Sequence, residues 1–186
     1  MSKAIFFDQT YFYEHTEVDE NVNWKMIRSS IWNAQEVYIQ DILGGTLYNL
    51  IRDEIISNNG TLTTARLVTL NDTYIAPVLL NYVMSDIQVP LLYKFREQST
   101  STNRSEFSTP ISHSEMVKLQ DYYRLKAERY ADKLYDYLCA NQSTYTEWTT
   151  YATSDLQRAK KPSATTGLYM GQSRTKGYGY EYYEKT

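Results

Sequence analysis

The fold is decided by the stretch "IRSSIWNAQEVYIQDILGGTLYNLI", residues 27–51, in which two helical patterns meet at a pair of glycines. Before the glycines, apolar residues recur at steps of three and four from Trp24 to Ile42. This period predicts a helix over 23–42, with Asn21 or Asn23 as its N-cap. A second helix is expected over 46–57, because "SNNG" supplies the residues at which helices commonly end.

The glycine pair itself allows two interpretations, a phosphate-binding loop or a turn between helices. A phosphate loop requires a GxxxxGK[ST] run, or a GxGxxG run after a strand. Gly44 and Gly45 stand in neither pattern, and no lysine follows them. Because glycine readily takes the positive φ at which helices end, we interpret the pair as a turn.

Two further helices are predicted downstream. One covers 64–98 and is interrupted by Pro77 and Pro90, since proline removes a backbone donor and clashes with the preceding turn. The other covers 112–140 and opens with the capping box Ser112-x-x-Glu115. The chain is therefore expected to be all-α, a helical bundle of four to five helices with extended N- and C-terminal arms.

This pattern divides the chain into an extended N-terminal arm (1–20), a helical domain (21–141) and an extended C-terminal tail (142–186). The aromatic residues of the arm are expected to bind a partner: Phe6, Phe7, Tyr11, Phe12 and Tyr13. The tail is rich in Gly, Ser, Thr, Lys and Tyr and poor in aliphatic residues, so we expect residues 158–186 to order only on docking to another protein. Its expected anchors are Tyr169, Tyr178, Tyr180, Tyr182, Tyr183, Arg174 and Lys176.

The charge is unevenly distributed along the chain. Residues 158–186 carry six bases and two acids, a net charge of +4, which leaves −7 on residues 1–157. The chain also has 19 tyrosines, a residue type that favours surfaces buried against a partner. Protein docking is the favoured use of the tail. Base stacking on a single-stranded nucleic acid is the alternative, weakened by the two glutamates among the tyrosines.

Signatures of catalysis and metal binding are missing from the sequence. His15 and His113 are far apart and are interpreted as exposed polar residues, and no GxSxG, SxxK or HExxH pattern occurs. Cys139, the single cysteine, excludes an intrachain disulfide and is expected to be a small buried side chain. We therefore expect a protein that is not an enzyme and has no metal or cofactor. Neither a secretion signal nor a membrane span is expected.

Three stretches together resemble a known family: residues 27–51, "LNDTYIAPVLLNYVMSDIQVPLLYKF" (70–95) and "LQDYYRLKAERYADKLYDYL" (119–138). They resemble the head–tail connector, or adaptor, proteins of tailed bacteriophages. The most specific parts are "AQEVYIQDILGGTLY" (34–48) and "YIAPVL" (74–79), although a single glycine is more usual at the turn. The resemblance covers roughly residues 20–140.

The resemblance implies a structural virion protein, made in the bacterial host cytoplasm, that forms a ring below the portal and joins the phage head to the tail. Its implied partners are other copies in a ring, twelve-fold like the portal, the portal itself and further tail or connector proteins, with DNA only as passing cargo. The polar loop 97–110 is expected to face the channel or an adjoining ring. The alternative is a cytosolic helical binding module whose tail recruits a protein or RNA.

Overall fold

The computed structural model describes residues 4–95, 100–102 and 112–149, and these form an all-α fold. The α-helices are α1 (Gln9–Glu14), α2 (Trp24–Ala34), α3 (Gln40–Ser57), α4 (Ala65–Leu70), α5 (Ala76–Asp86), α6 (Gln88–Leu92), α7 (His113–Ala140) and α8 (Thr146–Thr149). Two π-helical turns, η1 (Gln35–Ile39) and η2 (Asn71–Ile75), join α2 to α3 and α4 to α5. The predicted fold class is confirmed.

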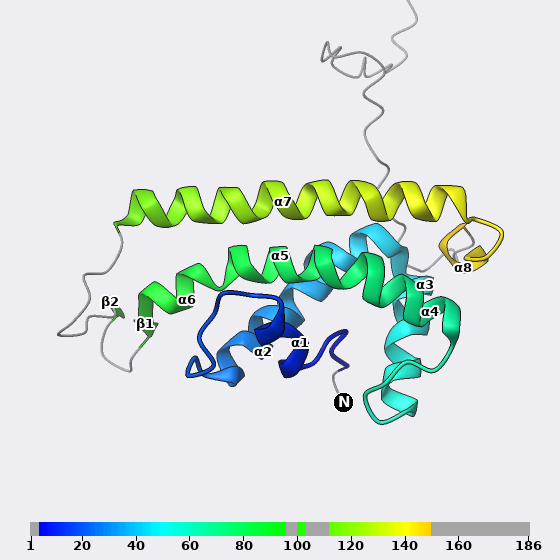
Figure 1. Ribbon diagram of the computed structural model, residues 1–186, viewed down its shortest axis with the longest axis horizontal. Coiled ribbons are helices and arrows are strands. Elements are labelled where there is room, and N and C mark those ends of the chain that lie inside the picture. Colours follow the sequence, from blue (N-terminus) through cyan, green and yellow to red (C-terminus); the bar gives the residue numbers. More distant parts are fainter. Residues whose placement is uncertain (1–3, 96–99, 103–111, 150–186) are drawn as a thin grey trace, which may run out of the picture.

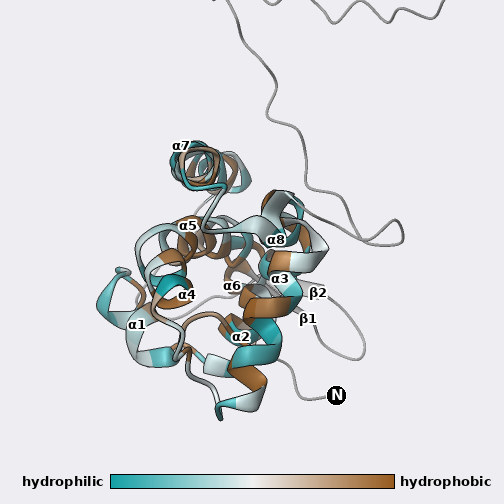
Figure 2. Ribbon diagram, turned by 90° about the vertical axis from the view of Figure 1, so that its right-hand side faces the viewer, coloured by the Kyte–Doolittle hydropathy of each residue, from teal (hydrophilic) through white to brown (hydrophobic). Residues whose placement is uncertain are grey.

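The helices form three long rods. The first is α2–η1–α3, the second is α4–η2–α5–α6, and the third is α7 alone. Figure 1 shows α7 running antiparallel to α5, and Figure 2 shows it as an outer layer over α5. Ser85 and Gln120 join these two helices by reciprocal hydrogen bonds between side chain and backbone, at 3.1 and 3.3 Å.

The first rod bends where the glycines predict. Asn23 caps α2 by accepting a hydrogen bond from the Lys25 amide at 2.9 Å. Gly44 has φ 72° and ψ 164°, which kinks the helix between Leu43 and Gly45. The rod ends at Asn58, after which Asn59 and Gly60 also take positive φ. The interpretation of the glycine pair as a turn between two helices is confirmed.

The second rod ends earlier than predicted, at Leu92 instead of residue 98. The chain then enters strand β1 (Tyr93–Phe95), whose backbone pairs antiparallel with β2 (Thr100–Thr102). Pro77 is the second residue of α5 and follows the π-turn η2 directly, and the rod continues through it. The remaining residues of the predicted 97–110 loop lie outside the described residues.

The third rod begins at the predicted capping box, in which Ser112 and Glu115 each accept a hydrogen bond from the other's backbone. Met116, Ala127, Leu134 and Leu138 form its buried face. Cys139 is exposed, so the expectation that it is buried is wrong. It follows Leu138 directly, and one residue turns an α-helix by about 100°, which carries its thiol off the buried face.

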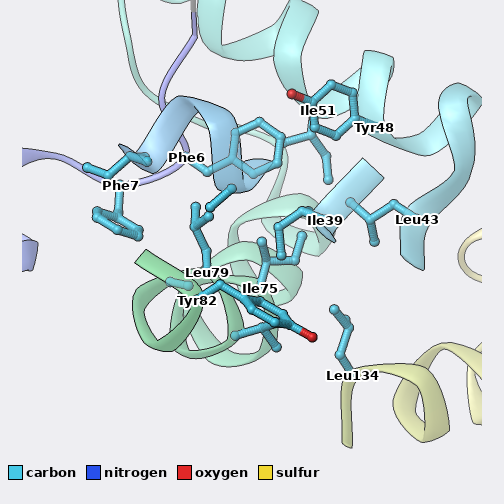
Figure 3. Packing of buried hydrophobic residues seen from close by; sticks show 14 of the residues in the cluster. Phe6, Phe7, Ile39, Leu43, Tyr48, Ile51, Ile75, Leu79, Tyr82 and Leu134 are labelled. Atoms are coloured by element: carbon cyan, nitrogen blue, oxygen red, sulfur yellow. The ribbon is translucent and has the colours of Figure 1, made fainter. Parts of the chain in front are cut away.

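The expected N-terminal arm is not extended in the described residues. Residues 4–22 fold back onto the body through α1, and Phe6, Phe7 and Phe12 lie in the core, with Phe12 fully buried. In Figure 3, Phe6 lies beside Tyr48 and Ile51 of α3. Burial of the three phenylalanine side chains removes apolar surface from water, which favours the folded-back path over an arm that leaves them exposed.

The body also extends further towards the C-terminus than the predicted boundary at residue 141. Tyr145 and Trp148 are each only 1% exposed, and α8 packs against α3. The indole Nε1 of Trp148 donates to the Ile42 carbonyl at 3.0 Å. Large aromatic side chains flanked by polar residues gave no helical period here, so the sequence pattern missed them.

One helical run in the described chain, Ala65–Leu92, is long and apolar enough to cross a membrane, with a mean hydropathy of 1.4. No such run was expected from the sequence. Its most apolar window is 61% buried within the fold, between the first rod and α7. A central helix of a folded core is also long and apolar, and the packing of Ala65–Leu92 between the first rod and α7 accounts for its apolar composition.

Candidate docking groove

The two π-turns share a five-residue pattern. Gln35–Ile39 reads "QEVYI" and Asn71–Ile75 reads "NDTYI": an amide, an acid, a β-branched residue, a tyrosine and an isoleucine. Both isoleucines are fully buried. Each tyrosine stacks on another: Tyr38 on Tyr82 with ring centroids 4.0 Å apart, and Tyr74 on Tyr137 at 3.9 Å.

The amide that opens each π-turn holds the N-terminal segment. Gln35 Oε1 accepts from the Phe6 amide at 3.0 Å, and Gln35 Nε2 donates to the Ala4 carbonyl at 3.3 Å. Asn71 Nδ2 donates to the Phe6 carbonyl at 2.9 Å. Two buried side-chain amides thus bind the backbone of residues 4–6 as a neighbouring strand would. We call this arrangement the amide clamp.

The amide clamp was not predicted from the sequence, although a signal for it was present. The two pentads lie within the two blocks that carry the family resemblance, "AQEVYIQDILGGTLY" and "YIAPVL" with the residues before it. Pairing of Gln35 with Asn71 could have been sought from that shared pattern. Their common partner, the backbone of residues 4–6, could not have been predicted, because every residue has the same backbone groups whatever its side chain.

A groove of ≈ 770 Å³ lies beside the clamped segment. It is bordered by the N-terminal segment, the start of α2, the end of α3, the loop at 59–62, and α4 with η2. Its apolar lining includes Ile5, Ile55, Ile56, Leu62 and Val68. Ile56 is 40% exposed, so part of this aliphatic lining faces solvent.

Charged and polar groups line the groove as well. Asp8 and Asp72 contribute carboxylates and Arg28 a guanidinium, all three on exposed residues. Asp8 caps α1 through the Tyr11 amide, and Asp72 accepts from Asn71 Nδ2 at 3.0 Å. Burial, followed by the nearby Asp72 carboxylate, raises the pKa of Tyr11. The groove therefore combines aliphatic surface with two fixed acceptors.

Asn71 has one further property. Its Oδ1 atom is the one buried side-chain polar atom without a hydrogen-bond partner among the described residues. The side chain is 5% exposed and lines the groove. An unpaired buried acceptor costs about 1–3 kcal/mol, so a donor that reached this atom would bind favourably.

A second surface lies on the outer side of α7. Tyr122 and Leu125 are 59% and 60% exposed and lie opposite the face that packs on α5. Five acids and five bases share the helix with them, including the Arg124–Glu128 pair at 3.3 Å. The surface mixes charged and apolar side chains, so it is a weaker docking candidate than the groove.

The last described residues are held by charge. Arg66 of α4 forms a two-pronged pair with Glu147 of α8, with N–O distances of 2.9 and 2.6 Å, and also donates to the Thr144 carbonyl. Hydrogen bonding to Arg66 keeps the pKa of Glu147 below its usual value. Tyr145, packed beside Arg66, donates to the Arg66 carbonyl at 2.9 Å.

The predicted partner-binding residues have separate outcomes. Those of the tail, Tyr169, Tyr178, Tyr180, Tyr182, Tyr183, Arg174 and Lys176, lie outside the described residues. Those of the arm do not form an open binding surface: three phenylalanines are buried, and Tyr11 and Tyr13 are half-buried. Tyr13 donates to the Val22 carbonyl at 2.9 Å, so its hydroxyl is used within the fold.

Within residues 4–95, 100–102 and 112–149, no three His, Cys, Asp or Glu side chains converge as metal ligands would. His15 and His113 are exposed, as predicted. The expectation of a protein without catalysis or cofactor stays a prediction.

The chain matches DUF6712, described as a family of unknown function, over residues 39–156. Since this is more than half of the chain, the protein belongs to that family. The matched region begins at Ile39, the last residue of η1. It includes α3 of the first rod, the whole second rod, α7 and α8. Comparisons with curated proteins and with solved structures found no match.

Proposed function

We propose that this DUF6712 protein is a structural subunit that forms a ring below the portal of a tailed bacteriophage, at the head–tail interface of the virion. The ring would join head to tail, bind the portal and further connector or tail proteins, and let DNA pass. The proposal starts from the connector resemblance of residues 27–51, 70–95 and 119–138. The main support is the position of those residues in the fold.

The resembling blocks coincide with the parts that set the geometry of the body. They contain both amides of the clamp, both stacked tyrosines of the π-turns, the kink at Gly44 and the proline that opens α5. These residues shape a scaffold, and none of them converges on a reaction centre. A resemblance concentrated in architecture favours a structural role over an enzymatic one.

Charge gives independent support. Residues 1–157 carry a net charge of −7. A channel through which DNA moves should not grip phosphates, and like charges repel them. The exposed Tyr122 and Leu125 of α7 and the apolar groove supply surface that subunits of an assembly could cover.

The test is to measure the mass of the full-length protein by native mass spectrometry, alone and with purified portal protein, and to image the product by electron microscopy. A closed homo-oligomer, or a stoichiometric complex with the portal ring, is expected. A protein that stays monomeric at all concentrations and does not bind the portal would contradict the proposal. Salt-sensitive binding of single-stranded RNA by such a monomer would favour the alternative, a cytosolic binding module.

A further inference from the structure

We propose that the groove beside the N-terminal segment binds the C-terminal tail, residues 158–186, of a neighbouring copy of this chain. The inference rests on the proposed ring, because it needs a second copy beside the first. It names a partner for the tail and assigns a use to the groove.

The lining of the groove suits a tyrosine-rich peptide. Ile5, Ile55, Ile56, Leu62 and Val68 offer aliphatic surface to aromatic rings. Binding pockets of a few hundred cubic ångströms and more typically combine such a lining with a few polar groups, and ≈ 770 Å³ lies in that range. A tyrosine ring buries a large apolar face while its hydroxyl still finds an acceptor. The Asp8 and Asp72 carboxylates on the lining supply such acceptors.

Charge complementarity favours the same occupant. The tail has a net charge of +4 and the rest of the chain −7. Arg174 and Lys176 lie just before four tyrosines, so the cations and the aromatic rings would reach the groove as one segment. The four are Tyr178, Tyr180, Tyr182 and Tyr183. Opposite charges steer such a segment to its site and make association weaken with salt. Among the described residues of the lining, Arg28 is the one cation, and it matches the few acids of the tail.

A ring adds a geometric reason for contact between copies. Ring closure by head-to-tail contacts requires two different, complementary surfaces on every subunit. The groove is one such surface and the tail is the other, so each copy can give its tail and receive one. The 37 residues after Thr149 span up to about 120 Å when extended, enough to leave α8 and reach an adjacent body.

The experiment uses disulfide trapping in the full-length chain. Cys139 is first replaced (Cys139→Ser), and Ile56→Cys in the groove is combined with Tyr178→Cys in the tail. The matched control combines Val37→Cys, a 58% exposed position outside the groove, with the same tail cysteine. Each variant is checked for native helicity by circular dichroism, oxidised, and separated on a non-reducing gel.

A ladder of covalent oligomers is expected for Ile56→Cys, at least tenfold above the Val37→Cys control. Reversal of the groove charge by Asp72→Lys should reduce the ladder several-fold, whereas Asp121→Lys on exposed α7 should not. A crosslink within single chains would contradict the inference, because the chain's own tail would then fill the groove. So would the absence of any crosslink above the control.

Native mass spectrometry of the wild-type chain separates this inference from the proposed function. A ring whose Ile56→Cys variant gives no ladder would overturn the groove contact and leave the ring standing. A chain that forms no oligomer, alone or with portal, would overturn the proposed function and this inference with it.

Discussion

The two ends of the described chain both dock on the body, but they are held by different chemistry. The N-terminal segment is bound by neutral amides, Gln35 and Asn71, and by buried phenylalanines. The C-terminal end combines the buried Tyr145 and Trp148 with the part-exposed Arg66–Glu147 ion pair. The two amides hold residues 4–6 through backbone groups, which do not titrate, whereas part of the C-terminal attachment depends on charge.

The largest expected effects come from the buried aromatic residue at each end. Phe12→Ala and Trp148→Ala should each lower the free energy of unfolding by about 3–5 kcal/mol, because each leaves a cavity in packed surroundings. Urea denaturation followed by circular dichroism measures both. Tyr122→Ala, at a 59% exposed position, is the control and should change stability little. A small loss for Trp148→Ala alone would show that α8 is only loosely joined to the body.

The next effect is expected at the fully paired amide of the clamp. Gln35→Ala leaves the Phe6 amide and the Ala4 carbonyl buried without partners, at about 1–2 kcal/mol each, so a total loss of about 2–4 kcal/mol is expected. The same denaturation experiment measures it. Gln9→Ala, at an exposed glutamine of α1, is the matched control. Equal stability of the two variants would mean that water replaces the clamp at no cost.

Asn71→Ala should cost less than Gln35→Ala, about 1–2 kcal/mol. It deprives the Phe6 carbonyl of one donor but also removes the unpaired Oδ1. The difference between the two variants therefore combines the second hydrogen bond of Gln35 with the cost of the unpaired acceptor of Asn71. A loss for Asn71→Ala as large as that for Gln35→Ala would indicate that Oδ1 has a partner in solution.

The smallest effect is expected at the ion pair, and it should depend on pH. The folded-state pKa of Glu147 is lowered, chiefly by its hydrogen bonds from Arg66, so its contribution is present above the unfolded pKa and is lost as pH falls through the folded value. Glu147→Gln should cost about 1 kcal/mol at pH 7. Below pH 4 the thermal midpoints of variant and wild type should converge. Glu17→Gln, at an exposed acid, is the control.

A constant gap between Glu147→Gln and the wild type from pH 7 to pH 3 would contradict the assignment. The N-terminal end supplies the contrast. The partners of Gln35 are two backbone groups and the Tyr48 side chain, whose pKa is raised above the ordinary value of 10, so none of them titrates between pH 3 and pH 7 and the Gln35→Ala loss should stay the same over that range. The two ends would then differ in pH response as they differ in chemistry.

Periodic signals in the sequence predicted the rods, and irregular segments were misjudged. The successful signals depend on residues that are close together in the sequence. They are the 3,4 spacing, the Asn23 cap, the Ser112–Glu115 capping box and the glycine turn, and each is present in the structure. Phe6, Phe7 and Phe12 follow no period, because they bind through a path that folds back on itself. Their burial depends on Gln35 and Asn71, whose distance in sequence hides the contact.

The candidate groove could not have been predicted for the same reason. Its lining comes from the N-terminal segment, α2, α3, α4 and η2, which meet only after the chain has folded. The charge contrast between tail and body was visible from the sequence, but the place where it would act was not. Sequence reasoning thus supplied the proposed ligand, and the structure supplied the proposed receptor.

The π-turns also affect how freely this chain can change its length. A π-turn holds one residue more than the α-helical turn that it replaces. A chain lacking Val37 or Thr73, exposed residues in the middle of each turn, would close into regular α-helix with both flanks keeping their faces. Single-residue gaps at these two points are therefore compatible with an unchanged fold, whereas the same gap inside α7 would rotate its buried face away from α5.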